Sequence, residues 1–591
     1  MIADSPTKLP TPVLTMPLRL VVPALLLSLL MGCAGAPSSP TVAEKPSLAG
    51  AESAKPEIPE RPFPEDSIYS LLVAEFAIRN KAYDVALDNY MEQAPILRDR
   101  GVSAHATHLG QYMQREAEAL EAVSLWTELE PNNAEANLTR GNLLVRRGEP
   151  LAALPHLATA QRNGAKVHFP ATLSGFRKLN PQQRAELLDG IDDLSKEFPD
   201  NSKLLLTQAL GRAEAKQFAQ ARKHLDALFK LEPDNEQALV LDAKVLIEQE
   251  APEPFARIKK TLSKDEDNSE LRLQYARLLT RSNMPEARKQ FEILSAKSPR
   301  DGDLLFSLAL INRETGDDLA AAAYLRQVLA LDQRVDDANY YLGRISEDKG
   351  DTEEALGYYM RVEDSNQYMP SNSRIGRLLL EKGDVTRSTR WFGTQRAENP
   401  TRKEQLYSLE ADLLAASGFN GPALTLLDTA IQAYPDATSL LYSRAMLREQ
   451  QDDLVGMEND LRNILESDPS NTTALNALGY VLANRTDRLE EALSLVSRAI
   501  ELQPNEPAIL DSMGWVLFRV GRNAEALTYL KRAYANFPDP EVAAHLGEVL
   551  WVSGDNDAAI AVWQAAALKD PDHEILTETL QRLGIELPLP K

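Results

Sequence analysis

The sequence is poor in the residues that usually carry covalent or redox chemistry. Its 591 residues contain one cysteine, Cys33, and seven histidines. A single cysteine cannot form a disulfide within the chain, so packing alone must hold the fold. We find no glycine-rich phosphate loop, no Gly-x-Ser-x-Gly elbow and no His-Glu-x-x-His motif. The sequence therefore predicts no catalytic residue, no metal site, no cofactor and no enzymatic activity.

Two short clusters come nearest to the spacing of metal ligands. His105 and His108 lie three residues apart and share a helix face, but no further ligand lies near them in the sequence. The run Asp265, Glu266, Asp267 lacks the glycine and the closing glutamate of a calcium-binding loop. We interpret the histidines as a structural or solvent-facing pair and the acidic run as a solvated turn.

Positive charge is scarce as well. The chain has 64 lysines and arginines against 87 aspartates and glutamates, a formal net charge of −23. An acidic chain of this kind repels nucleic acid and anionic membrane surfaces, and no domain-scale basic patch offsets the repulsion. Nucleic acid is therefore not an expected partner.

Long apolar runs are missing, apart from a short one near the N-terminus. Residues 20–31 are mostly apolar; this run of about 12 residues is shorter than the roughly 20 that a membrane-spanning helix needs. It fits the hydrophobic region of a cleaved signal peptide. Residues 30–33, Leu-Met-Gly-Cys, resemble the lipobox of bacterial lipoproteins. The resemblance implies that residues 1–32 are a signal peptide, with Met16 as an alternative start, and that Cys33 is lipidated.

Proline is concentrated in residues 33–66, which carry seven prolines among serine, alanine and glutamate. Such a composition favours extended, polyproline-like conformations. We interpret the stretch as a lipidated tether that holds the folded part off the membrane; a segment without a role is the alternative. Ala34 stands where lipoproteins retained in the inner membrane typically carry aspartate. That resemblance implies a lipid-anchored location on the periplasmic face of the outer membrane.

The feature that runs through the rest of the chain is a repeat. Near the C-terminus, Pro435, Pro469, Pro504, Pro538 and Pro571 recur at intervals of 34, 35, 34 and 33 residues. Between the prolines, each unit has a small residue in its first half and an alanine in its second half. The small residues are Gly479, Gly514 and Gly547, and the alanines are Ala492, Ala526 and Ala559.

This pattern is typical of stacked pairs of antiparallel helices. Two helices pack closely only where small residues let their backbones approach, and each pair exposes an apolar flank that the next pair covers. The proline ends the second helix because it lacks the amide hydrogen and clashes with the preceding turn. The residues and their period resemble the tetratricopeptide repeat family. The resemblance implies an all-α, right-handed superhelical solenoid of tetratricopeptide-type helix pairs.

The same register extends upstream and predicts about 15 units over residues 67–571. A capping helix and tail should follow over residues 572–591. The units at 164–200 and 250–268 match poorly, because prolines at 170, 181, 252 and 254 interrupt the pattern. We interpret them as kinks in the superhelix.

Candidate protein-binding residues follow from the repeat register. In this family the first helix of each unit lines the concave face, at positions three before, one after and one turn beyond the small residue. Arg344 and Arg377 lie in adjacent repeats and could together hold a carboxylate. The alternative for the aromatic residues is that they only pack between repeats. The full set is Tyr340, Arg344, Arg377, Asn476, Tyr480, Asn484, Asp511, Trp515, Arg519 and Trp551.

Two segments, residues 476–488 and 509–517, are more specific than the general repeat. They resemble the tetratricopeptide outer-membrane lipoproteins of proteobacteria, and within that group the lipoprotein partners of the periplasmic carboxyl-terminal processing protease. The resemblance implies an adaptor that binds this serine protease and promotes proteolysis of its cell-wall hydrolase substrates. Two other interpretations stay open: a scaffold lipoprotein for polysaccharide export or outer-membrane assembly, and an enzyme hidden in the irregular units near 164–200.

Overall fold

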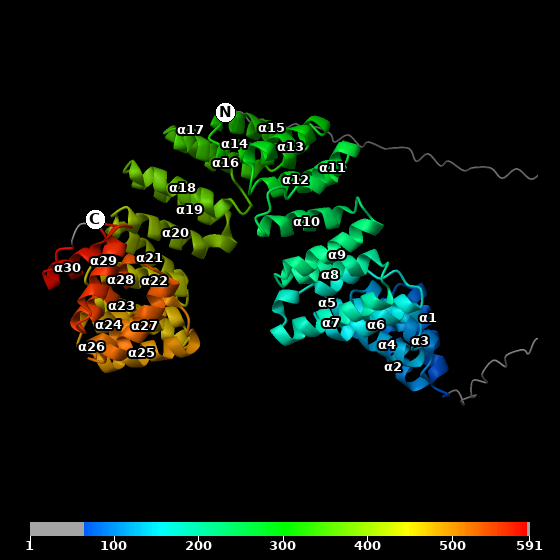
Figure 1. Cartoon of the computed structure of the whole chain (residues 1–591). Coiled ribbons are helices and arrows are strands. Elements are labelled where there is room, and N and C mark those ends of the chain that lie inside the picture. The colour runs from blue at the N-terminus through cyan, green and yellow to red at the C-terminus, as the bar shows by residue number, and fades with distance from the viewer. Residues whose placement is uncertain (1–63, 588–591) are drawn as a thin grey trace, which may run out of the picture.

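The computed structural model describes residues 64–587, and in these the chain forms an open arc of stacked helices (Figure 1). The arc runs from the blue helices α1 (Ser67–Arg79) and α2 (Tyr83–Leu97), through the green middle, to the red α30 (Glu574–Leu583). The predicted signal peptide, Cys33 and almost all of the predicted tether lie outside the described residues. Within residues 64–587, no helix is both long enough and apolar enough to cross a bilayer.

The described chain contains helices and no strands, and the helices pair in chain order. Fourteen regular pairs and one irregular unit make fifteen units, so the predicted all-α repeat solenoid is confirmed. The regular pairs after α1 and α2 are α3 (Arg100–Tyr112) with α4 (Glu116–Leu129), α5 (Ala134–Arg146) with α6 (Pro150–Arg162), α8 (Ser202–Glu214) with α9 (Phe218–Leu231), α10 (Glu236–Glu248) with α11 (Ala256–Lys264), α12 (Ser269–Leu279) with α13 (Met284–Lys297), α14 (Gly302–Glu314) with α15 (Asp318–Ala330), α16 (Val335–Asp348) with α17 (Thr352–Tyr359), α18 (Tyr368–Glu381) with α19 (Val385–Glu398), α20 (Lys403–Ala416) with α21 (Asn420–Ala433), α22 (Thr438–Gln450) with α23 (Leu454–Ser467), α24 (Thr472–Arg485) with α25 (Leu489–Leu502), α26 (Pro507–Arg519) with α27 (Asn523–Asn536), and α28 (Pro540–Val552) with α29 (Asn556–Ala567).

The irregular unit lies at the first of the two places where prolines interrupt the repeat; at the second, the pair α10 and α11 is kept but α11 has only 9 residues. Two short 3₁₀ helices, η1 (Phe169–Leu173) and η2 (Phe176–Lys178), stand in place of a first helix, and α7 (Pro181–Glu197) serves as the second. Proline is well placed at the first position of α7, since its missing amide hydrogen would have no partner there. A third 3₁₀ turn, η3 (Pro400–Arg402), precedes α20.

Local sequence explains where the regular helices begin. Asn471 precedes α24, and its side-chain oxygen accepts the amide hydrogen of Ala474 at 3.0 Å, which caps the helix. Between α26 and α27 the chain reverses through Gly521, whose φ of 88° is open to glycine at little cost. Caps and glycine turns of this kind mark where these helices begin and end.

The small residues of the repeat lie where paired helices touch. A Cβ atom added to Gly514 on α26 would meet Cγ of Leu530 on α27 at 2.5 Å, and one on Gly479 would meet Cγ2 of Val496 at the same distance. Ala526, on the facing side of α27, is fully buried. The close approach binds α26 to α27 into a rigid pair, and the last units then share one continuous apolar core from Leu441 to Leu576.

Candidate protein-binding groove

A groove with a volume of about 690 Å³ lies along the first helices of the last units. Its lining comes from α22, α24, α26 and α28, with Ile575 of α30 at one end. Side chains of α24 and α28, which belong to units two apart, touch each other across α26. Helices two units apart can meet only on the inside of a curved stack, so the groove lies on the inner face of the solenoid.

A buried polar network joins three units at the floor of this groove. His545 Nδ1 on α28 lies 2.9 Å from Asp511 Oδ2 on α26. His545 Nε2 lies 3.4 Å from the hydroxyl of Tyr480 on α24, and that hydroxyl donates to Glu541 Oε1 at 3.1 Å. The ring of Trp515 stacks on the imidazole with 4.3 Å between centroids. The network fixes the side chains that face the groove.

Electrostatics decide the charge of this network. Burial by itself lowers the pKa of His545, but the facing carboxylates of Asp511, Glu541 and Glu548 outweigh it and raise the pKa. In its charged form the imidazolium donates from both ring nitrogens, to Asp511 and to the Tyr480 hydroxyl. Burial, followed by the nearby carboxylates, raises the pKa of Tyr480, so the phenol keeps its proton and donates it to Glu541.

Three polar atoms at the groove are left without a hydrogen-bond partner among the described residues: Oδ1 of Asn476, Oδ1 of Asp511 and Nε1 of Trp515. The Asp511 side chain is buried, and both Asn476 and Asp511 line the groove. A buried acceptor without a donor costs about 1–3 kcal/mol. Both oxygens are closed to solvent, so an incoming N–H group reaches them only when the side chains around them shift.

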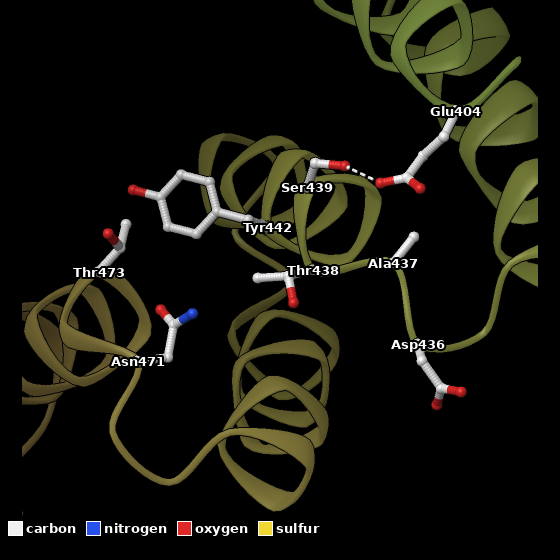
Figure 2. A pocket seen from close by; sticks show the side chains of 8 residues that line it. All are labelled: Glu404, Asp436, Ala437, Thr438, Ser439, Tyr442, Asn471 and Thr473. Carbon is white, nitrogen blue, oxygen red and sulfur yellow. Dashed lines mark hydrogen bonds between the residues drawn. The ribbon is translucent and has the colours of Figure 1, made fainter. Parts of the chain in front are cut away.

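A second hollow, of about 630 Å³, adjoins the groove near the start of α22 (Figure 2). Tyr442 lines both spaces and links them. Figure 2 shows Thr473 of α24 pointing toward the Tyr442 ring, and on the other side Ser439 donating to Glu404 of α20 at 2.9 Å. Through Tyr442, the hollowed surface continues from α30 back to the first turns of α22 and α20.

Comparisons with known proteins agree with this architecture. A family model described as tetratricopeptide repeat matches residues 277–333, 318–370, 458–507 and 512–574. The TPR repeat-containing protein PA4667 of Pseudomonas aeruginosa is 36% identical over 535 residues, which cover 89% of this chain and 90% of that protein. The chain belongs to the tetratricopeptide repeat proteins.

Among solved structures, yeast Tom70 is 16% identical, with 88% of this chain and 95% of that chain covered and a TM-score of 0.31. The Thermus thermophilus protein TTC0263 is 23% identical over 31% of this chain and all of its own, with a TM-score of 0.28.

Tetratricopeptide repeat proteins are generally non-enzymatic scaffolds that bind other proteins. This tetratricopeptide repeat protein is accordingly a protein-interaction scaffold or adaptor.

Six of the predicted binding residues meet at the groove of this tetratricopeptide repeat protein. Asn476, Tyr480, Asn484 and Asp511 line it. Trp515 is buried behind them, stacked on the network imidazole. Arg519 Nη1 donates to the backbone carbonyl of Asn484 at 3.3 Å, which joins α26 to α24 at the rim.

The other four predicted residues lie elsewhere. On α18, Arg377 donates to Glu347 at 2.9 Å, and Arg374 donates to the same carboxylate oxygen at 2.8 Å. The predicted pair Arg344 and Arg377 therefore does not form a joint carboxylate site. Arg377 is already bonded to the protein's own Glu347, and the second arginine at that carboxylate is Arg374, not Arg344. Tyr340 packs near the ring of Tyr359, at 5.9 Å.

Trp551 on α28 packs against Trp563, with ring centroids 6.0 Å apart, and it does not line the groove. Its neighbour Trp563 is fully buried on the second helix. Trp551 thus occupies a packing position between the two helices of its own unit.

Sequence reasoning missed four residues at the groove. His545 and Glu541 come from a unit two repeats away from Tyr480, and no local motif links them. Tyr442 and Met446 flank Ala445 as the predicted residues flank the repeat glycines. If alanine as well as glycine had been allowed at the small position of the repeat, the same offsets would have identified Tyr442 and Met446 as candidates.

The two clusters that resembled metal ligands have ordinary roles. His108 Nε2 lies 3.0 Å from Glu135 Oε1, and the His105 ring packs edge-on against Tyr90 at 5.6 Å. Asp267 pairs with Lys297 at 2.6 Å. Across residues 64–587, no group of three histidine or carboxylate side chains is placed to hold a metal ion.

Proposed function

We propose that this protein is a lipid-anchored periplasmic adaptor at the outer membrane, which binds a carboxyl-terminal processing serine protease and brings it cell-wall hydrolases as substrates. The observation that carries the binding role is the inner groove with its two buried, unpartnered acceptors, Asn476 Oδ1 and Asp511 Oδ1. An extended polypeptide offers backbone N–H donors at regular intervals and is the ligand that such acceptors fit.

The identity of the partner and the location are supported by the sequence. The segments 476–488 and 509–517, which resemble the protease-binding lipoproteins, supply Asn476, Tyr480, Asn484, Asp511 and Trp515 at or behind the groove. The lipobox ending in Cys33 supports the anchor, because two or three acyl chains at about 0.8 kcal/mol per buried carbon hold a protein firmly on a bilayer.

An affinity purification from detergent extracts of the native cells tests the partner. The full chain serves as bait, and the retained proteins are identified by mass spectrometry. We expect a carboxyl-terminal processing protease to be enriched. Asn476→Ala removes one groove acceptor and should reduce its capture, whereas Asn536→Ala, an exposed asparagine at the end of α27, should not. Recovery of only export or outer-membrane assembly components would contradict the protease partner.

Fractionation tests the anchor separately. The unaltered chain should sediment with outer membranes, and Cys33→Ser should appear in the soluble periplasmic fraction, since the thiol that accepts the lipid is gone. A Cys33→Ser chain that still sediments with outer membranes would contradict lipid anchoring.

A further inference from the structure

We infer that the groove of α22 to α30 selects an extended polypeptide segment that carries lysine or arginine side chains between apolar ones. The inference rests on the protein-binding role proposed above and specifies the chemistry of the bound segment. It follows from the charge of the groove, from the distribution of its apolar residues and from its unpartnered acceptors.

The charge of the groove is strongly one-sided. Five carboxylates line it, and among the described residues no lysine or arginine does. These are Glu449, Glu506, Asp511, Asp539 and Glu541. The adjoining hollow adds two further carboxylates, of Glu404 and Asp436, and again no basic side chain.

Only part of this negative charge is matched by the protein itself. The buried imidazolium of His545 faces Asp511, and Arg485 reaches Glu449 at 3.4 Å from outside the groove. Glu541 accepts the neutral Tyr480 hydroxyl. The exposed Glu506 makes no ion pair within 64–587. The groove therefore attracts cationic side chains and repels the carboxylate of a polypeptide C-terminus or an acidic peptide.

Apolar side chains lie between the carboxylates. Tyr442 and Met446 form one wall, and Phe537, which is 56% exposed, stands with Ile575 at the other end. An exposed phenylalanine beside a hollow is an anchor that an apolar side chain can cover. Successive side chains of an extended chain point to opposite sides, so alternating apolar and basic residues would reach the apolar wall and the carboxylates in turn.

The buried acceptors complete the fit. Asp511 is 6% exposed, and its Oδ2 is already engaged by His545, so Oδ1 is the atom left for a ligand. Asn476 Oδ1 lies one helix earlier on the same surface. Two N–H donors of the bound segment, from its backbone or from a basic side chain, would satisfy both acceptors.

Two synthetic peptides test the selectivity directly. The first is a fluorescent ten-residue peptide with both termini blocked, in which every second residue is lysine and the residues between are leucine or glycine, and the second has glutamate in place of each lysine. Binding to the purified full chain is measured by fluorescence anisotropy. We expect the lysine peptide to bind at least tenfold more tightly, with the difference shrinking as salt rises from about 20 mM to about 200 mM, because screening shortens the reach of the charges.

A matched pair of double variants locates the site. Glu449→Gln with Glu506→Gln removes two groove charges that lie outside the buried network, and Glu490→Gln with Glu501→Gln removes two exposed charges on α25. The groove variant should bind the lysine peptide about tenfold more weakly, since each solvent-facing charge pair contributes a few-fold. The α25 variant should bind within twofold of the unaltered chain.

Equal affinity for both peptides, or equal binding by the two double variants, would overturn the inference. The same groove variant used as bait in the affinity purification separates this result from the proposed function. If the protease is captured although the peptides are not distinguished, the proposed function stands and the cationic selectivity falls. If the lysine peptide binds selectively but no protease is captured, the selectivity stands and the protease partner falls.

Discussion

The buried imidazole of His545 allows a quantitative test of how the last units are held together. Its side chain is 3% exposed and that of its partner Asp511 is 8% exposed, so solvent hardly screens the pair. His545→Gln keeps a donor for Asp511 but removes the positive charge and the ring stacked on Trp515. Breaking one side of a buried ion pair costs about 3–5 kcal/mol, and the remaining hydrogen bond places the expected loss at about 3 kcal/mol.

Hydrogen exchange is the suitable assay, because a long repeat array does not unfold in one step. A loss of about 3 kcal/mol should speed the exchange of protected amides in α26 and α28 by roughly a hundredfold. Amides of α5 and α6, at the other end of the arc, serve as the internal control and should not change. Adding Asp511→Asn removes the uncompensated charge, and the double variant should regain about 1.5–3 kcal/mol of the loss.

The pH dependence has a definite sign. The folded pKa of His545 is raised above its unfolded value of about 6.5, so the stabilisation is complete below that pH and is lost as pH rises through the folded pKa. Between the unfolded and the folded pKa of His545, the free energy of unfolding falls by about 1.4 kcal/mol per pH unit. Exchange in α26 and α28, corrected for its intrinsic rate, should therefore accelerate from pH 6.5 upward in the unaltered chain and less steeply in His545→Gln. Identical slopes in both proteins would refute the reasoning.

Three further perturbations can be read by the same local exchange. Gly514→Val places atoms inside the contact with Leu530 and should cost about 3 kcal/mol by overpacking; unchanged protection of α26 would contradict the close approach. Asp460→Asn replaces a carboxylate that is 2% exposed and pairs with Arg444 at 2.6 Å, so the arginine loses its buried counter-charge. The local stability of α22 and α23 should fall by about 3 kcal/mol. Arg582→Met leaves the buried carboxylate of Glu548 on α28 without its ion-pair partner, so the free energy of opening α30 should fall by about 1–2 kcal/mol. Unchanged exchange in α30 would show that apolar packing alone holds this helix.

Much of the groove was predictable from the repeat register. Asn476, Tyr480 and Asp511 stand at fixed offsets from Gly479 and Gly514, and one helix turn separates Tyr480 from Asn484. These offsets place side chains on one face of each first helix, because a helix repeats every 3.6 residues. The same rule placed Tyr340 and Arg377 on first helices, but it could not show that Arg377 is already paired.

Partners across repeats were not predictable in this way. Glu347 binds Arg374 and Arg377 from the next unit, and His545 reaches Tyr480 across 65 residues of sequence. Whether side chains from two units meet depends on the rotation between successive pairs. That rotation is the sum of many small packing contacts, none of which leaves a motif.

The amino-acid sequence by itself determined the units: the spacing of prolines and small residues makes each helix pair, and the apolar flanks make the pairs stack. These are local requirements, satisfied within about 34 residues at a time. Only the tertiary structure decided the groove, because its shape, its buried imidazolium and its excess of carboxylates arise where first helices from several units converge on the inside of the curve. The curvature of the stack, a property of no single repeat, brings those charges together.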